Sequence, residues 1–104
     1  MTDGTLTRET RIRISDAQVS AALEGETVIL SMRDGIYFGL DRVGSRIWEL
    51  AQQPTTLGAI AQGIVAEFDV DEATAFVDLA RLAEELATHG LVELSPPVPG
   101  SGGS

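Results

Sequence analysis

The chain has 104 residues, room for one domain, and 43% of them are hydrophobic, which is enough for a modest core. It carries 7 Lys and Arg residues against 16 Asp and Glu, a formal net charge of −9, and no cysteine. The lack of cysteine excludes disulfides, zinc–thiolate sites and thiol catalysis. The net negative charge opposes nucleic-acid binding. No apolar run approaches the roughly 20 residues of a membrane helix, and residues 1–15 do not resemble a signal peptide. We expect a cytoplasmic protein without a membrane or nucleic-acid partner.

Apolar residues alternate with polar ones in the first 40 residues, which predicts strands. A first strand is expected over residues 6–14, with an uncertain register, and a second over residues 28–33. Asp34-Gly35 follows, a dipeptide preferred in tight hairpin turns because Gly takes positive φ freely. The hairpin predicts a short third strand over residues 36–40.

Helical periodicity replaces alternation after residue 40. Asp41 can cap a first helix, which Pro54 ends, and either Thr55 or Thr56 can cap a second. Asp71 can cap a third and longest helix of about five turns. These caps divide the second half of the chain into three helices.

Gly90 is a good stop for the third helix, because helices commonly end on a glycine in the left-handed conformation. A short extended segment follows over residues 91–94. We expect residues 1–94 to form one domain and residues 95–104, rich in Pro, Gly and Ser, to form a disordered tail. The element order predicts an α+β, winged-helix-like fold, with a three-stranded antiparallel sheet followed by three helices.

Residues that could carry catalysis or bind a metal are scarce. His89 is the only histidine, and its position near a helix end favours a simple interaction with the helix dipole. No phosphate-binding or dinucleotide-binding motif is present, so we expect no cofactor and no enzyme activity. Trp48 is expected in the core. Arg33, Arg42 and Arg46 flank the third strand, either as solubilising residues or as partners for acidic side chains of a bound peptide.

The third strand lacks the features that usually protect a sheet edge. Residues 36–40 contain no lysine, no proline and no charge. Either another element covers this strand, or it accepts a partner strand through its backbone. Alternation puts Ile36, Phe38 and Leu40 on one face and Tyr37 and Gly39 on the other, where Gly39 allows another backbone to approach closely.

The stretch DGIYFGLDRVGSRIWELA, followed by TTLGAIAQGIVAEFDVDEATAFVDLARLAEELATHGLVEL, resembles the PqqD-like family of recognition elements for ribosomally made, post-translationally modified peptides. The resemblance covers residues 27–94, and the matching pattern contains no catalytic residues. It implies that a leader peptide adds as a strand to the third strand, in a groove against the third helix. It also implies a role in presenting the leader to modifying enzymes. The chain length is closest to the binding proteins of lasso-peptide pathways, whose partners are a leader peptidase and a cyclase.

Carried onto this chain, the resemblance implies that the third strand and the turn before it pair with the leader. These residues are Gly35, Ile36, Tyr37, Phe38, Gly39 and Leu40. It implies a groove wall on the third helix made of Phe76, Leu79, Ala80 and Ala83, with polar contacts from Asp78 and Arg81.

Three other interpretations are open from the sequence. A winged-helix DNA-binding protein would share the fold, but its recognition helix would carry five acids and only Arg81 and His89 as cations. A PqqD-like partner of a radical enzyme in another peptide pathway is a second alternative. A homodimer joined through the open strand is a third, so a monomer or a weak homodimer is expected.

Overall fold

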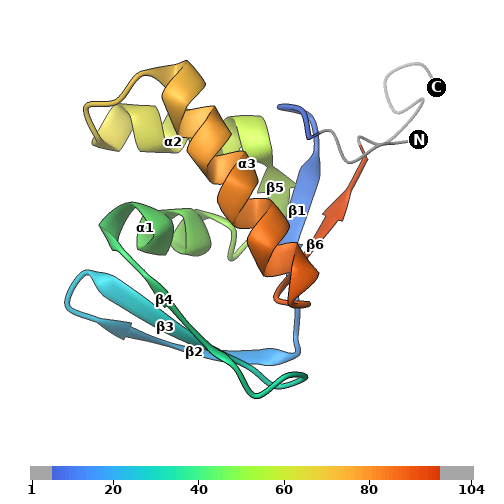
Figure 1. The fold of residues 1–104 in the computed structure, drawn as a ribbon. Helices are drawn as coiled ribbons and strands as arrows, with labels where there is room; N and C mark the ends of the chain where they lie inside the picture. Colours follow the sequence, from blue (N-terminus) through green and yellow to red (C-terminus); the bar gives the residue numbers. More distant parts are fainter. Residues whose placement is uncertain (1–5, 97–104) are drawn as a thin grey trace.

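The structure, a computed structural model, describes residues 6–96, which form two small antiparallel sheets and three helices (Figure 1). The elements are β1 (Arg11–Ile14), β2 (Gln18–Leu23), β3 (Glu26–Ser31), β4 (Tyr37–Leu40), α1 (Arg42–Leu50), β5 (Thr55–Thr56), α2 (Leu57–Glu67), α3 (Glu72–Thr88) and β6 (Val92–Ser95). Within these residues, no helix has the length and apolar character required to cross a membrane.

The main sheet is the meander β2-β3-β4. A two-residue turn joins β2 to β3, with Glu24 at φ 40° and Gly25 at φ 86° between the paired residues Leu23 and Glu26. Positive φ at both central positions is the geometry of a type I′ turn, whose twist matches that of the flanking strands. The first strand of this sheet is therefore residues 18–23, which the sequence analysis did not identify as a strand.

The β3–β4 connection is longer than the expected two-residue turn. Ser31 donates its N–H to the Ile36 carbonyl at 2.9 Å, and four residues lie between them. Gly35 has φ 70° and donates its N–H to the Ser31 carbonyl at 2.8 Å. The Asp34-Gly35 pair thus does mark the hairpin, with the glycine as the residue that takes positive φ, but in a longer connection over residues 32–36.

A second sheet, β5-β1-β6, joins the beginning of the described chain to its end. The expected first strand over residues 6–14 is correct only from Arg11, and it does not pair with β3. Instead, Ile12 lies opposite Leu94 and Ile14 opposite Val92. The apolar alternation of this strand therefore reflects burial beneath the helices, because Ile12 is 2% exposed.

The three helices begin where the sequence predicts. Asp41, Thr56 and Asp71 are the N-caps, and each side chain accepts a hydrogen bond from the backbone N–H three residues later, at 2.8, 3.2 and 3.1 Å. These bonds satisfy N–H groups that have no partner within the helix. The structure thus selects Thr56, the second residue of β5, over Thr55 as the cap of α2.

The end of α3 is a complete Schellman motif. Gly90, at φ 75°, donates its N–H to the Ala87 carbonyl at 3.0 Å, and Leu91 donates to the Leu86 carbonyl at 2.9 Å. Leu86 and Leu91 are both buried, which supplies the hydrophobic contact that accompanies this motif. The chain thereby turns sharply from α3 into β6.

The core lies between the two sheets and the helices, and α1 covers one face of the main sheet (Figure 1). Ile29 and Leu40 enter it from β3 and β4, and Trp48 enters it from α1 and is buried, as expected. The α+β fold with a three-stranded antiparallel sheet followed by three helices is confirmed. Strand β6 extends through Ser95, one residue into the expected tail, and residues 97–104 lie outside the described part of the chain.

Candidate functional site

Strand β4 is an edge of the main sheet, and the ladder shows which of its backbone groups are free to bind a partner. Because Ser31 donates to the Ile36 carbonyl, alternation in an antiparallel ladder directs the backbone groups of Phe38 and Leu40 towards β3. The N–H and C=O groups of Tyr37 and Gly39 therefore point towards the open edge. The sequence alone left this parity undetermined.

The side chains of β4 divide between two faces as predicted. Leu40 is buried and Phe38 is half-buried beneath the helices, whereas Tyr37 is 70% exposed on the opposite face. Ile36 was expected on the same face as Phe38 and Leu40, but it is 44% exposed because it precedes β4 and lies in the loop connection. Gly35 also precedes the strand.

A groove of about 490 Å³ lies between the end of β4 and α3. It is lined by Gly39 and Leu40 of β4, by Asp41, by Val43, Gly44 and Ile47 of α1, by Ile64 of α2, by Val70, and by Thr74, Ala75, Asp78, Arg81, Leu82 and Glu85 of α3. We call this the α3 groove. Its floor is apolar, and its rim carries three carboxylates and one guanidinium.

Helix α3 meets the groove with only one of its flanks. Asp78, Arg81, Leu82 and Glu85 are spaced three or four residues apart, so they lie on one side of the helix. Asp78 and Arg81, the two residues expected to make polar contacts, are thus brought to the groove. Leu82 and Glu85 were missed, although Leu82 lies four residues after Asp78 and Glu85 four residues after Arg81, a spacing that was available as a signal.

The apolar residues expected to form a groove wall on α3 do not line the α3 groove. Leu79 and Ala83 are 0% and 1% exposed and form part of the core. Phe76 and Ala80 are half-buried on the flank away from the groove and do not line it. The most apolar stripe of an amphipathic helix packs into its own domain, so a surface open to a ligand lies beside that stripe.

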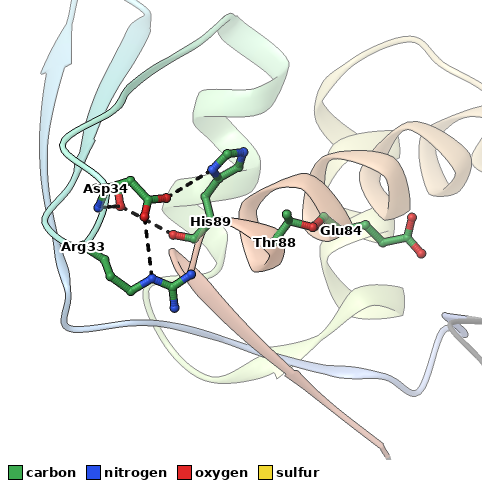
Figure 2. Close-up of polar contacts among 6 residues, drawn as sticks. Arg33, Asp34, Glu84, Thr88 and His89 are labelled. Atoms are coloured by element: carbon green, nitrogen blue, oxygen red, sulfur yellow. Dashed lines mark hydrogen bonds and ion pairs between the residues drawn. The ribbon is translucent and has the colours of Figure 1, made fainter.

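The C-terminal end of α3 is fastened to the β3–β4 hairpin by His89 (Figure 2). Its ring nitrogen Nδ1 lies 3.4 Å from the Asp34 carboxylate, and its backbone carbonyl lies 3.5 Å from the Ser31 hydroxyl. Its ring also packs against Phe38, with 4.7 Å between centroids. These contacts close one end of the space between β4 and α3, so the α3 groove opens beside residues 39–41.

The arginines that flank β4 already have partners within the chain. Arg46 donates to Glu49 at 2.8 Å and to Glu67 at 2.6 Å, and these side-chain hydrogen bonds raise its pKa. The Arg42 guanidinium lies over the Phe68 ring, 5.7 Å from its centroid. Pairing of Arg46 with a bound peptide would therefore require an existing ion pair to break.

The other edge of the main sheet, β2, lacks the same combination. A second hollow of about 400 Å³ reaches β2 only at Ala22, next to the β2–β3 turn, and its walls include the paired side chains of Arg46, Glu49 and Glu67. At β4, free backbone groups and a groove with an apolar floor lie side by side. An extended segment can there bind through its backbone and place alternate side chains in the groove.

Comparison with known proteins agrees with this geometry. Residues 26–92 match the family model described as coenzyme PQQ synthesis protein D (PqqD). A solved structure described as TbiB1 in complex with the TbiA(beta) leader peptide is 44% identical, with a TM-score of 0.73 over 78% of this chain and 94% of that chain. A lasso peptide synthetase B1 complexed with the leader peptide shares the fold, at 23% identity and a TM-score of 0.69 over 79% of this chain and 96% of that chain.

No curated protein sequence matches the chain significantly. The family match nevertheless spans well over half of the chain and runs from the start of β3 to the start of β6. It includes the open edge of β4, the α3 groove and the α3–β6 turn. The chain therefore belongs to the PqqD family.

Proposed function

We propose that this protein captures the leader segment of a ribosomally made precursor peptide by strand addition to β4. The observation that carries the proposal is the open edge at Tyr37 and Gly39, directly beside the α3 groove. A strand added there, parallel or antiparallel to β4, extends the main sheet by one strand. It satisfies backbone groups that otherwise face water. The similar structure at 44% identity, described as a complex with a leader peptide, supports this function.

Strand addition sorts the side chains of the leader into two sets. Leader residues opposite Phe38 and Leu40 point to the helix side of the sheet, where the α3 groove receives them. Leader residues opposite Tyr37 and Gly39 point to the other side. The backbone bonds supply affinity for any extended peptide, and the groove supplies selectivity for particular side chains.

The site consists of β4 with the turn before it, together with the groove flank of α3. Residues 35–40 remain assigned to leader contact, with Tyr37 and Gly39 supplying the backbone groups that pair with it, and Asp78 and Arg81 remain assigned to polar contacts. Leu79 and Ala83 hold α3 in place from the core. Leu82 and Glu85 join the site because they line the groove.

In this proposal the protein is not a catalyst but a presenting partner. It holds the leader while separate enzymes, a leader peptidase and a cyclase of a lasso-peptide pathway, act on the precursor. The shared fold with a protein described as lasso peptide synthetase B1 supports the choice of pathway. Since the precursor is made on ribosomes, we expect the protein to act in the cytoplasm.

Titration of the protein with a labelled leader peptide tests the function. We expect a dissociation constant between roughly nanomolar and micromolar, about −8 to −12 kcal/mol, and a negative heat-capacity change from apolar burial. The same precursor incubated with the protein alone should remain unprocessed. Binding to the core peptide but not to the leader, or processing by the purified chain, would contradict the proposal.

A further inference from the structure

Three charged side chains on the groove flank of α3 have no ion-pair partner within the described part of the chain. Asp78, Arg81 and Glu85 are spaced three and four residues apart, a spacing at which opposite charges on a helix can pair. None of them forms an ion pair there, whereas Arg46, at the second hollow, lies 2.6 Å from Glu67. The charges in the α3 groove are therefore available to a ligand.

The rim of the α3 groove is negatively charged. Asp41, Asp78 and Glu85 contribute three carboxylates against the single guanidinium of Arg81, a net charge of −2. The Asp41 carboxylate already accepts a hydrogen bond from the Gly44 N–H at 2.8 Å, so it is occupied in capping α1. Asp78 and Glu85 are exposed and lie on either side of Arg81 along α3. A cation can therefore approach a free carboxylate at either end of this flank.

The floor of the same groove is apolar, and this restricts the kind of side chain that fits. Val43 and Ile47 of α1, Ile64 of α2 and Leu82 of α3 line it. A purely aliphatic side chain would fill the floor but leave the carboxylates at the rim without a counter-charge, and an acidic one would be repelled by them. Lysine and arginine match both parts of the groove, because their cation is carried on an aliphatic stem.

We infer that the leader presents a lysine or arginine to the α3 groove, with its stem on the apolar floor and its cation at Asp78 or Glu85. This inference rests on the proposed function and specifies which leaders the site selects. Groove-side residues of an added strand are about 6.7 Å apart, and the groove lies beside residues 39–41. The basic residue is therefore the leader residue that lies opposite Leu40.

The net charge of the whole protein acts in the same direction but over a longer range. A charge of −9 attracts any basic peptide and accelerates its encounter with the protein. This general attraction changes little with the identity of the acid that is removed, whereas a contact in the groove depends on Asp78 and Glu85. Comparison of acids inside and outside the groove therefore separates the two contributions.

The experiment compares the double variant Asp78→Asn/Glu85→Gln and the single variant Glu85→Gln with Glu84→Gln. All three carboxylates are exposed on α3, but Glu84 does not line the groove. The probe is the labelled leader peptide of the precursor, measured by fluorescence anisotropy. We expect Glu84→Gln to change the dissociation constant by less than about twofold, Glu85→Gln to raise it by about two- to threefold, and the double variant to raise it by roughly fivefold. Arg81→Gln removes a guanidinium that repels the cation, so it should tighten binding by about twofold.

A second series keeps the wild-type protein and changes the peptide. Each lysine and arginine of the leader is replaced in turn by glutamine. One replacement should weaken binding to the wild-type protein by roughly fivefold and have almost no effect on binding to the double variant, in which the ion pair is already absent. The wild-type measurements do not depend on the folding of any variant.

The outcomes separate this inference from the proposed function. If the wild-type protein does not bind the leader, the proposed function fails. If the leader binds but the double variant retains the wild-type affinity, or Glu84→Gln weakens binding as much as Glu85→Gln does, only the charge inference fails. Weaker binding by Arg81→Gln would also overturn it, since the groove would then select an acidic leader residue. A leader whose affinity survives every single replacement of lysine and arginine would do the same.

Discussion

The imidazole of His89 packs edge-on against the ring of Phe38, with 4.7 Å between centroids and 61° between ring planes. The contact joins the C-cap of α3 to the edge strand of the main sheet, and both of these elements border the α3 groove. An edge-to-face pair of this kind has a preferred geometry, so it fixes the separation of the two elements as well as adding stability.

A double-mutant cycle measures this contact. Phe38→Ala should lower the free energy of unfolding by about 1.5–3 kcal/mol, less than for a fully buried ring because Phe38 is half-buried. The free energies of unfolding of Phe38→Ala, His89→Ala and the double variant, measured by urea denaturation, should give a coupling energy of about 0.5–1.5 kcal/mol between the two rings. The control cycle pairs His89→Ala with Tyr37→Ala, whose ring lies on the other face of β4, and should give almost no coupling. Equal coupling in both cycles would mean that the ring contact has no specific role.

Proline substitution along β4 tests backbone pairing with the leader. Tyr37→Pro and Gly39→Pro remove N–H groups that face the open edge, so the protein should stay folded and bind the leader more weakly. Each lost bond contributes about 0.5–1.5 kcal/mol, or roughly a two- to tenfold change in dissociation constant by calorimetry. Phe38→Pro removes a donor to β3 and should lower the melting temperature first. Unchanged leader affinity in folded Tyr37→Pro and Gly39→Pro variants would rule out strand addition at β4.

A bulky residue at the rim tests whether the leader occupies the α3 groove. Glu85→Trp places a large ring at the groove, whereas Glu84→Trp places the same ring on the next residue of α3, outside the groove lining. Both positions are exposed, so both variants should fold. Fluorescence anisotropy with labelled leader should show at least roughly tenfold weaker binding for Glu85→Trp and a change within about twofold for Glu84→Trp. Equal effects at the two positions would place the leader elsewhere.

The acidic charge of α3 predicts no specific binding to duplex DNA at physiological salt. A helix in the major groove must place cations against phosphates, and α3 offers Arg81, with His89 at its cap, against five acids counted from Asp71. Gel-shift titrations with random and genomic duplexes should show no retained complex. A sequence-specific shift that persists at that salt would instead favour the winged-helix DNA-binding alternative.

The sequence predicted the helices well because their boundaries are set by local chemistry. Asp41 and Asp71 cap through their own carboxylates, and Gly90 takes the positive φ that the end of α3 requires. Each signal lies within a few residues of the boundary that it marks. The burial of Trp48 likewise follows from its position on the apolar side of α1.

The sheets were predicted less well because their pairing depends on residues far apart in the chain. Strand β2 contains Ser20, Ala21 and Ala22, which have little strand preference, and its turn uses Glu24 rather than the usual Asn or Asp. The α3 groove was misplaced for a related reason. Helical periodicity identifies the stripe that packs inward, and only the observed packing shows which flank stays open.

The pairing of β1 with β6 has a consequence for how the protein is made. Arg13 and Glu93 join across this ladder at 2.8 Å, although 80 positions separate them along the chain. Contacts between such distant segments form late, because the loop between them must close first. On the ribosome, β1 can therefore pair with β5 once residues 55–56 have emerged, but its ladder with β6 must wait for residues 92–95.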